Sequence, residues 1–560
     1  MKPQIISSLK KAGIKLPEKQ IKSLIEIPPS TEMGDFAFPC FILAKEMKKN
    51  PNQIAEELAK KIKSKEFEKV ESKGPYINFF VNRITLAENL IKEIKKQGDK
   101  FGSSKETNKT VMFEFSQPNT HKAFHVGHIR GTSLGESLSR IYEFSGNKVI
   151  RANYSGDTGM HIAKWIWCYQ KYHAKEKLKD DEAWIASIYV DAVRRLKENE
   201  TLQEEVKKIN KKIDERSDKK INELWEKTRK LSIDSWKKIY KELNTKFDKH
   251  YFEGTIEQKG KAIAKELLNK KIAEISDSAT IVDLKKFDMG VWVVLRSDGT
   301  VLYSAKDLAL AEQKYKDYPK LSSSFVLIAY EQDFYFRQLE KILELINFKH
   351  AKDYHHISFG MVRLPTGKMS SRTGDNILYS DFMKDITDFA KKRIKKTMPA
   401  ISQKELDNKA EKISIAAIKY SMLKQSPNKN IVFKKEDALS FEGDTGPYIQ
   451  YSYVRASSIL RKVKSQKEKT KIRKLEQKEI ELIKKLSEFQ DIVQKAYTTL
   501  NPSLIANYSY QLAQTFNEFY HTCPVMNSEK QNFRIELVDS FRQVLKNSLG
   551  LLGIDVLERM

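Results

Sequence analysis

The sequence predicts an α/β protein with a parallel-sheet core, a small mixed module before it and an all-helical region after it. A strand at Val111–Phe115, a helix at 126–144 and a strand at Val149–Asn153 succeed one another within about forty residues, which is typical of strand–helix–strand units in parallel sheets. The 560 residues exceed the length of one domain, for which about 150 is usual. From about Tyr379 the pattern is helical to the end.

The N-terminal module combines a predicted helix at Asn52–Ser64 with a predicted strand at Tyr76–Val81. A charged stretch with interspersed tryptophans predicts helices inserted into the α/β domain. The expected domains are residues 1–105, 106–380 with the helical insertion at about 171–275, and 381–560.

The chain is strongly basic, with 101 Lys and Arg against 74 Asp and Glu and a formal charge of +27. This excess favours a polyanionic partner, above all nucleic acid, although a proteome rich in lysine is an alternative explanation. Only Cys40, Cys168 and Cys523 occur, which excludes a disulfide scaffold or a cysteine-rich zinc site and fits a reducing cytosol. Without a recognisable signal peptide or membrane span, we expect a cytoplasmic protein and no membrane partner.

The motif HVGH, residues 125–128, follows a predicted strand and opens a helix. Gly127 allows close approach of a nucleotide to the backbone. His125 and His128 can donate to phosphate oxygens at a helix N-terminus, where the helix dipole favours anions. For the four residues alone, two ordinary surface histidines are an equally good explanation.

A second polar segment, Gly367 to Gly374, carries two hydroxyls and the cations Lys368 and Arg372. Such a loop can close over a triphosphate and stabilise the charge of a leaving pyrophosphate. Alone it would be read as an exposed basic turn, but its occurrence together with HVGH favours a nucleotide site.

These motifs, with EFSQPNTHKAFHVGHIRG, NYSGDTGMHIAKW, DGTVLYSAKDLA, FEGDTGPYIQYSYVRASSILRK and the terminal LERM, resemble the arginyl-tRNA synthetases of class I. HVGH and KMSSR are similar to the two ATP-binding signatures of that class. The resemblance runs essentially from residue 1 to 560, and the DTGMH form is similar to the archaeal branch. It implies a Rossmann-type catalytic core, an N-terminal additional domain that contacts the tRNA elbow, and a helical anticodon-binding domain.

A guanidinium group prefers planar carboxylate acceptors, and the sequence places acidic residues where the family binds arginine. Tyr303 and Asp307 share a face if a helix starts there. The resemblance implies that Asn119 and Gln332 orient the amino acid. It assigns the side-chain pocket to Glu114, Tyr303 and Asp307.

The ATP site implied by the resemblance comprises Gly127, His125, His128, Met361, Lys368 and Ser370, with adenine against Gly127 and the backbone around Gly360–Val362. One departure is Ser371, which stands where the class usually has a lysine. Lys122, Lys368 and Arg372 therefore remain alternatives for the cation at the β- and γ-phosphates. With His125 and His128 they form the predicted catalytic set, and they are expected to act electrostatically.

The resemblance also implies tRNA contacts at both ends of the chain. Tyr76 would stack on a base of the D-loop and Asn78 would hydrogen-bond its edge, whereas a simple core strand is the alternative. Tyr448 and Arg455, two helical turns apart, are expected to contact the anticodon, with Tyr520 and Met560 as weaker candidates. For Arg455 and Tyr520, helix packing is the alternative explanation.

The sequence thus predicts an arginine–tRNA ligase that forms arginyl-adenylate from ATP and transfers arginine to the 2′-hydroxyl of the terminal adenosine of tRNA-Arg. We expect Mg²⁺ to accompany ATP, no zinc or other protein-held metal, and a monomer. The family suggests that activation requires tRNA. The alternatives are a class I synthetase for another amino acid, and a catalytically silent tRNA-binding protein, for which Ser371 is the one favourable feature.

Overall fold

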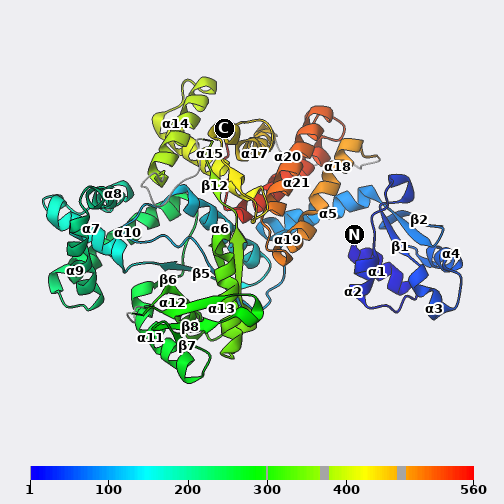
Figure 1. Cartoon of the computed structure of the whole chain (residues 1–560). Coiled ribbons are helices and arrows are strands. Elements are labelled where there is room, and N and C mark those ends of the chain that lie inside the picture. The colour runs from blue at the N-terminus through cyan, green and yellow to red at the C-terminus, as the bar shows by residue number, and fades with distance from the viewer. Residues whose placement is uncertain (1, 298–300, 366–376, 463–473) are drawn as a thin grey trace. The chain divides into compact units, whose positions relative to one another are not determined.

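The computed structural model describes residues 2–297, 301–365, 377–462 and 474–560 (Figure 1). The chain divides into two compact units. The first comprises Met1–Phe101, Ala456–Glu488 and Gln514–Val544, and the second Gly102–Arg455, Phe489–Ala513 and Leu545–Met560. Three helices contribute residues to both units: α17 (Gly446–Lys462), α20 (Ser503–Thr522) and α21 (Gln531–Leu551).

The first unit contains an antiparallel sheet in the order β1 (Phe36–Pro39), β3 (Tyr76–Val81), β2 (Phe67–Lys73). Its other helices are α1 (Lys2–Lys11), α2 (Glu18–Leu24), α3 (Ala44–Met47), α4 (Pro51–Lys61), α5 (Arg83–Gln97) and α18 (Gln477–Ser487). Ile5, Ile54 and Phe79 are fully buried between the sheet and its helices. The strand at Tyr76–Val81 has its predicted bounds, and the predicted helix at Asn52–Ser64 is α4.

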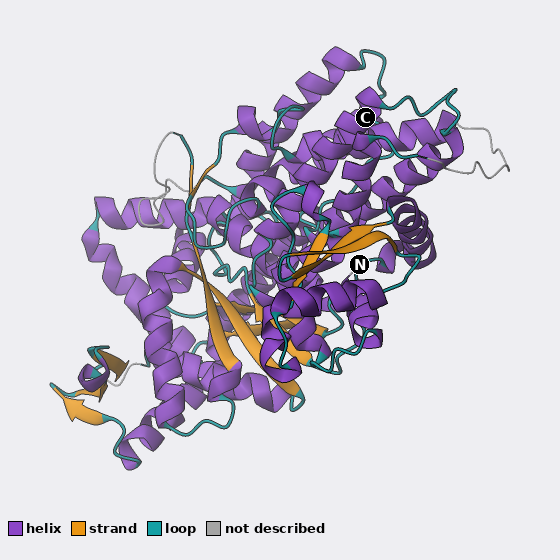
Figure 2. Ribbon diagram, turned by 90° about the vertical axis from the view of Figure 1, so that its right-hand side faces the viewer, coloured by secondary structure: helices purple, strands orange, loops and turns teal. Residues whose placement is uncertain are grey.

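A five-stranded parallel sheet forms the centre of the second unit (Figure 2). The strand order is β11 (Tyr354–Phe359), β10 (Leu321–Ala329), β4 (Thr110–Glu114), β5 (Lys148–Ser155), β6 (Lys249–Phe252). The chain proceeds from β4 outward to β6 and later places β10 and β11 on the other side of β4. The direction of winding therefore reverses between β4 and β10, where doubly wound sheets bind ligands at the carboxyl ends of their strands.

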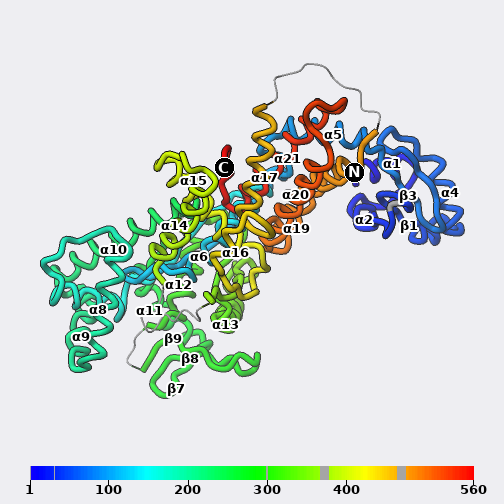
Figure 3. Tube along the Cα trace, turned by 90° about the horizontal axis from the view of Figure 1, so that it is seen from above, coloured from blue at the N-terminus to red at the C-terminus, as the bar shows by residue number. Residues whose placement is uncertain are grey.

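One face of this sheet packs against α11 (Glu253–Asn269), α12 (Tyr303–Asp317) and α13 (Asp333–Leu345). A small antiparallel sheet of β7 (Glu274–Ser276), β8 (Ala279–Asp283) and β9 (Val291–Leu295) extends this layer (Figure 3). Met112, Ile150 and Ala152 point into the shared core, which includes Trp292 of β9.

Helix α6 (Val126–Phe144) connects β4 with β5 and has the predicted bounds. A buried ion-pair network fixes it to the sheet: Arg151 of β5 donates to Glu136 at 2.9 Å and to Glu143 at 2.6 Å. Arg151 and Glu136 are each 1% exposed. Bidentate arginine–carboxylate pairs fix orientation, and here they fix the helix whose N-terminus carries HVGH.

The helical insertion consists of α7 (Met160–Cys168), α8 (Glu182–Glu198), α9 (Gln203–Asp214) and α10 (Lys219–Glu242), which form one helical group in Figure 1. Its core contains Trp165 and Trp225. The insertion differs from the expected range of about 171–275 because residues 249–252 pair with 152–155 as the edge strand β6. The helical segment therefore ends before Lys249.

In the described ranges after Leu378, the regular elements are helices except for the two-residue strand β13 (Ile431–Val432), which pairs with β12 (Val362–Arg363). The remaining helices are α14 (Tyr379–Thr397), α15 (Gln403–Leu423), α16 (Lys435–Ala438) and α19 (Phe489–Thr498). In the described ranges, every helix is too short or too polar to cross a membrane. The predicted fold class is confirmed.

Candidate active site

Several of the predicted arginine-binding residues lie near the carboxyl ends of β4 and β10. Glu114 is the last residue of β4, and Gln332 lies exposed in a short helical turn directly after β10. Helix α12 begins at Tyr303, so Tyr303 and Asp307 are one turn apart, as expected. This is the edge at which a parallel sheet of this topology binds ligands.

The loop between β4 and α6 has an unusual backbone. Ser116, Gln117 and His121 have φ values of 76°, 53° and 62°. A non-glycine residue in this region costs about 1–3 kcal/mol and persists only where its surroundings hold it. Helix α10 holds this loop in place. The Tyr240 hydroxyl lies 2.9 Å from Ser116 Oγ, and the His121 N–H donates to Ser232 Oγ at 3.1 Å.

The two histidines of HVGH cap helix α6 reciprocally. His125 Nδ1 accepts the N–H of Gly127 at 3.1 Å, and His128 Nδ1 accepts the N–H of His125 at 3.1 Å. Their ring centres lie 3.8 Å apart. Because each Nδ1 is an acceptor, the single proton of each neutral ring belongs on Nε2.

Burial lowers the pKa of His125 to about 4. Burial, followed by the positive charges that His125 and Lys122 can carry, lowers the pKa of His128 well below its usual value. Both rings are therefore neutral near pH 7. Each has one Nε2–H donor at a helix N-terminus, an arrangement that suits phosphate oxygens.

Asp307 lies beside two tyrosine side chains and is poorly solvated. The Tyr335 hydroxyl donates to Asp307 Oδ2 at 2.7 Å, and the Tyr335 ring centre lies 4.8 Å from that of Tyr303, which is 60% exposed. Burial, followed by the charges of Glu114 and Glu253, raises the pKa of Asp307 to about 7, although the Tyr335 hydrogen bond opposes the shift. A bound cation would oppose that shift and hold the carboxylate ionised.

Glu114 is 2% exposed and already has a cationic partner. Its Oε1 accepts from Gln117 Nε2 at 2.9 Å, and its Oε2 lies 2.5 Å from Lys314 Nζ in an ion pair that lacks hydrogen-bond geometry. Lys314 is fully buried, and its Nζ lies 5.1 Å from the Tyr354 ring centre. Sequence analysis missed Lys314, which stands two helical turns after Asp307 on α12.

Asn119 contacts the chain after β5. Its Oδ1 accepts the Gly156 N–H at 3.2 Å, and a Cβ at position 156 would lie 2.5 Å from that oxygen, so a larger residue there would displace the Asn119 side chain. Glu253, which begins α11, is a second residue that sequence analysis missed. It raises the pKa of Asp307 and pairs with Lys306 at 3.3 Å. No sequence signal marks Glu253, because the short strand β6 that precedes it is defined by its pairing with β5.

Lys122 precedes the HVGH motif, and its Nζ lies 5.5 Å from the Tyr189 ring centre. Burial, followed by the charge of Lys164, lowers its pKa. It is the one predicted phosphate-binding cation within the described ranges.

The other predicted loop residues, Lys368, Ser370, Ser371 and Arg372, lie outside the described residues. Where the description resumes, the Tyr379 N–H donates to the Phe124 carbonyl at 2.9 Å. Leu378 pairs with His125 in an isolated bridge. The chain that follows the predicted loop thus lies beside the two histidines.

Met361 directly precedes β12, and both its backbone N–H and its carbonyl are already hydrogen-bonded. The Met361 N–H donates to Asn430 Oδ1 at 2.8 Å, and its carbonyl accepts the Ile431 N–H at 2.9 Å. The expected adenine contact would have to use a neighbouring residue or displace Asn430.

In the N-terminal unit, Tyr76 is half-buried and its ring meets that of Phe41 edge-on, with centres 6.1 Å apart. Phe41 is 52% exposed. Asn78 is only 4% exposed on the central strand β3, so the predicted base-edge contact would require a local movement.

The predicted anticodon residues all lie on or after α17. The Tyr448 ring centre is 5.7 Å from that of Tyr510, and the Arg455 guanidinium lies 5.0 Å from the Tyr451 ring centre. Tyr520 on α20 is 38% exposed, and Met560 packs against the core around α14 and α15.

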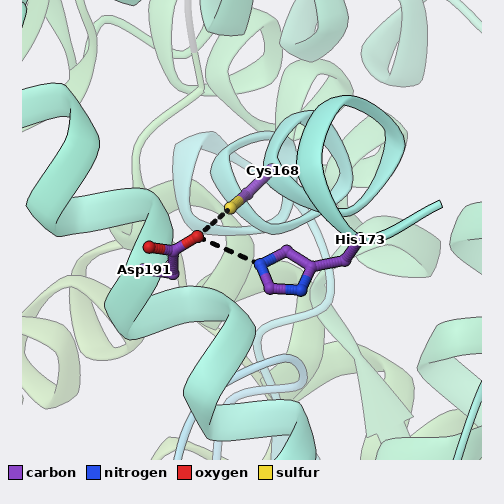
Figure 4. A group of neighbouring side chains, drawn as sticks. All are labelled: Cys168, His173 and Asp191. Atoms are coloured by element: carbon purple, nitrogen blue, oxygen red, sulfur yellow. Dashed lines mark hydrogen bonds and ion pairs between the residues drawn. The ribbon is translucent and has the colours of Figure 1, made fainter. Parts of the chain in front are cut away.

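One group of side chains outside this site resembles a metal centre (Figure 4). Cys168, His173 and Asp191 converge on one another, because a π-helical turn at 169–173 brings the first two to one side. Cys168 Sγ lies 3.5 Å and His173 Nε2 3.0 Å from Asp191 Oδ2.

The contacts of this group are those of an ion-pair cluster. Arg195 Nε also donates to Asp191 Oδ2, at 2.8 Å, and Arg194 pairs with the other oxygen. Although burial opposes them, the hydrogen bonds of His173 raise its pKa. Burial and Asp191 raise the pKa of Cys168 to about 12. A protonated thiol and two guanidinium groups that already pair with Asp191 favour a structural role between α7 and α8.

Family models match three consecutive parts of the chain. They are the "Arginyl tRNA synthetase N terminal domain" at residues 1–81, the "tRNA synthetases class I (R), catalytic domain" at 90–435 and the "DALR anticodon binding domain" at 449–560. Combined with the parallel sheet and the capped HVGH helix, these matches define a class I aminoacyl-tRNA synthetase.

Individual similar proteins show to which family within this class the chain belongs. The arginine–tRNA ligase of Clostridium perfringens is 39% identical to this chain, over 100% of this chain and 99% of its own length. The arginine–tRNA ligase of Clostridium acetobutylicum is also 39% identical, over 96% of both chains. Arginyl-tRNA synthetase of Thermus thermophilus matches with a TM-score of 0.80 at 25% identity, over 100% of this chain and 99% of its own. The chain belongs to the arginyl-tRNA synthetase family. The predicted family and the predicted ATP-dependent arginine–tRNA ligase activity are confirmed.

Proposed function

We propose that the edge formed by β4, β10, α6 and α12 activates arginine. The arginine carboxylate attacks the α-phosphate of ATP, giving arginyl-adenylate and pyrophosphate. The 2′-hydroxyl of the terminal adenosine of tRNA-Arg then attacks the adenylate and releases AMP. The observation that carries this assignment is a poorly solvated carboxylate, Asp307, beside two tyrosine rings, near the sheet edge where two neutral histidines lie at a helix N-terminus.

In the amino-acid pocket, Asp307 is the principal acceptor for the guanidinium group, and Tyr303 forms the exposed wall. Glu114 contributes negative charge from a position that Lys314 already neutralises in part. Asn119 and Gln332, from the loops after β4 and β10, orient the α-amino and carboxylate groups. A fixed carboxylate suits the rigid donor fork of arginine and rejects acidic substrates.

The phosphates of ATP occupy the N-terminus of α6. His125 and His128 donate from Nε2, and Lys122, Lys368 and Arg372 supply charge to the β- and γ-phosphates. Gly127, Ser370 and the backbone next to Met361 complete the proposed nucleotide site. We propose that Mg²⁺ enters with ATP, coordinated largely by its phosphates, where it neutralises their charge. These groups act by orientation and electrostatics and do not become covalently modified.

The two ends of the chain are proposed to bind tRNA. Tyr448 and Arg455, with Tyr520 and Met560 in weaker roles, contact the anticodon. In the N-terminal module, Tyr76 stacks on a D-loop base, and Asn78 reads its edge after a local opening of β3. The exposed Phe41 ring beside Tyr76 supports an aromatic base-binding surface there.

Replacing Tyr76 by alanine is expected to weaken tRNA-Arg binding roughly ten- to a hundredfold, because stacking on an aromatic side chain contributes about 1–3 kcal/mol per base. Tyr76→Phe keeps the ring and should bind within about threefold of the wild type. Equilibrium binding of labelled tRNA at fixed salt measures both variants. Equal loss of affinity in the two variants would contradict stacking.

The KM for arginine is expected to fall about tenfold between pH 6 and pH 8, because the pKa of Asp307 is raised to about 7. Guanidinium binding requires the ionised carboxylate, which is a minor form at pH 6 and the major form at pH 8. Steady-state kinetics across this range measures the effect. The KM for ATP serves as the control, since Asp307 does not face the phosphates in the proposed site.

Arginine-dependent ATP–pyrophosphate exchange, with and without tRNA-Arg, tests the assignment directly, with lysine, glutamate and cysteine as controls. Exchange with arginine but not with the three other amino acids supports the proposed arginine pocket. If exchange also requires tRNA-Arg, activation depends on tRNA. Exchange with another amino acid would overturn the substrate. Intact tRNA binding without exchange would favour the silent binder.

We also propose that the enzyme acts as a cytoplasmic monomer. Three buried cysteines without disulfides support a reducing compartment. Light scattering at micromolar concentration tests the oligomeric state, and fractionation of source cells tests the location.

A further inference from the structure

Strand β12 lies next to α6 and has one edge without a strand partner in the described structure. β12 and β13 form a two-stranded sheet, in which Val362 is opposite Ile431. The carbonyls of Met361 and Arg363 accept the N–H groups of Ile431 and Phe433, so they point toward β13. Successive residues of a strand point their backbone groups to opposite edges, which directs the N–H and C=O of Val362 away from β13.

Val362 packs with Val126 and Ile129, which belong to the first turns of α6. Its outward N–H and C=O are a donor–acceptor pair of the kind that complements N1 and the 6-amino group of adenine. In the proposed ATP site, adenine lies against this stretch of backbone, so Val362 replaces Met361 as its hydrogen-bonding partner.

The direction of β12 is fixed by a turn at residues 426–430. The Gly360 N–H donates to the Pro427 carbonyl at 2.9 Å, and the Met361 N–H donates to Asn430 Oδ1 at 2.8 Å. A Cβ at position 360 would lie 2.3 Å from the Lys429 carbonyl oxygen, so the contact requires glycine. The chain entering β12 is thus hydrogen-bonded to this turn at two successive residues, Gly360 and Met361.

Arg130 holds the same turn from α6. It is fully buried two residues after HVGH, and its Nη2 donates to the carbonyls of Pro427 at 3.0 Å and Ser426 at 3.3 Å. The Pro427 carbonyl therefore accepts from both Arg130 and Gly360. Within the described residues, the Arg130 side chain donates only to these two carbonyls, so a buried cation is committed to the turn.

We propose that Arg130 and Asn430 are positioning residues for adenine: together they hold β12 so that the backbone of Val362 reads the base. This inference rests on the proposed ATP site at α6. It assigns an effect on the KM for ATP to two side chains that lie about 300 positions apart in the sequence. Neither side chain is proposed to contact the phosphates.

The test compares Arg130→Ala, Asn430→Ala and the double variant in ATP–pyrophosphate exchange. Each single variant is expected to raise the KM for ATP about tenfold and to leave the KM for arginine within about twofold. Because both act on one turn, the double variant should be clearly less impaired than the product of the two single effects. Asn430 is exposed, so its replacement leaves the core intact even if Arg130→Ala fails to fold.

Arg140→Ala is the matched control, since Arg140 lies on the same helix but binds Glu136 and the Gly550 carbonyl. It should leave the KM for ATP unchanged. An equal increase in Arg140→Ala, a parallel increase in the KM for arginine, or fully multiplicative effects of the two single variants would each overturn the proposal. Absence of exchange in the wild-type protein would instead reject the proposed function.

Discussion

Replacing His128 by asparagine is expected to slow arginine-dependent ATP–pyrophosphate exchange about 10²–10³-fold, the usual loss when one preorganised donor to developing charge is removed. His128 Nδ1 accepts the His125 N–H, and its Nε2–H is the donor available to a phosphate. The asparagine amide oxygen can replace Nδ1 in the cap but cannot reach the position of Nε2. The variant therefore separates catalysis from helix capping.

His128→Gln is the matched variant, because its amide nitrogen can approach the position of Nε2 while the cap is lost. We expect it to be more active than His128→Asn and less thermostable. Both variants should bind tRNA-Arg as the wild type does, since the tRNA surfaces are proposed elsewhere. If asparagine preserves activity and glutamine abolishes it, His128 acts through the cap alone.

The parts of the fold that the sequence predicted depend on local patterns. Helix α6 occupies residues 126–144 as expected, because a strand, a turn and a helix-like run follow one another there. Strand β6 was missed: its four residues, Lys249–Phe252, include Lys249 and His250 and lie at the sheet edge. So short and polar a strand is defined by its pairing with β5, which no local pattern reveals.

The candidate site divides in the same way. Tyr303, Asp307 and the two histidines were found because motifs and helical spacing place them. Lys314 and Glu253 were missed, since a lysine and a glutamate on amphipathic helices are ordinarily solvent-exposed. Only the tertiary structure buries Lys314 against Glu114 and brings Glu253 to the sheet edge.

Asn78 illustrates the limit of strand alternation. The alternating pattern correctly groups it with Tyr76, on the face opposite Ile77 and Phe79. It does not reveal whether that second face is covered, and Asn78 is 4% exposed between β1 and β2.

Replacing Asp307 by asparagine is expected to lower kcat/KM for arginine about 10²–10³-fold, or roughly 3–4 kcal/mol, the range for removing one partner of a buried charge pair. Asparagine has nearly the same shape and can still accept from the Tyr335 hydroxyl, so the pocket should remain folded. What is lost is the negative charge opposite the guanidinium. The dependence of the arginine KM on pH near 7 should disappear with it, because the titrating group is gone.

Asp317→Asn provides the comparison for this prediction. Asp317 ends the same helix, α12, and pairs with Lys249 at 2.8 Å, away from the pocket. Its replacement should leave the arginine KM and its pH dependence unchanged. If Asp307→Asn has a weak effect and the arginine KM still depends on pH, the guanidinium group binds Glu114 or Glu253 instead. Because Lys314 already neutralises Glu114 and Lys306 pairs with Glu253, Asp307 is the pocket carboxylate with most to gain from a cationic substrate.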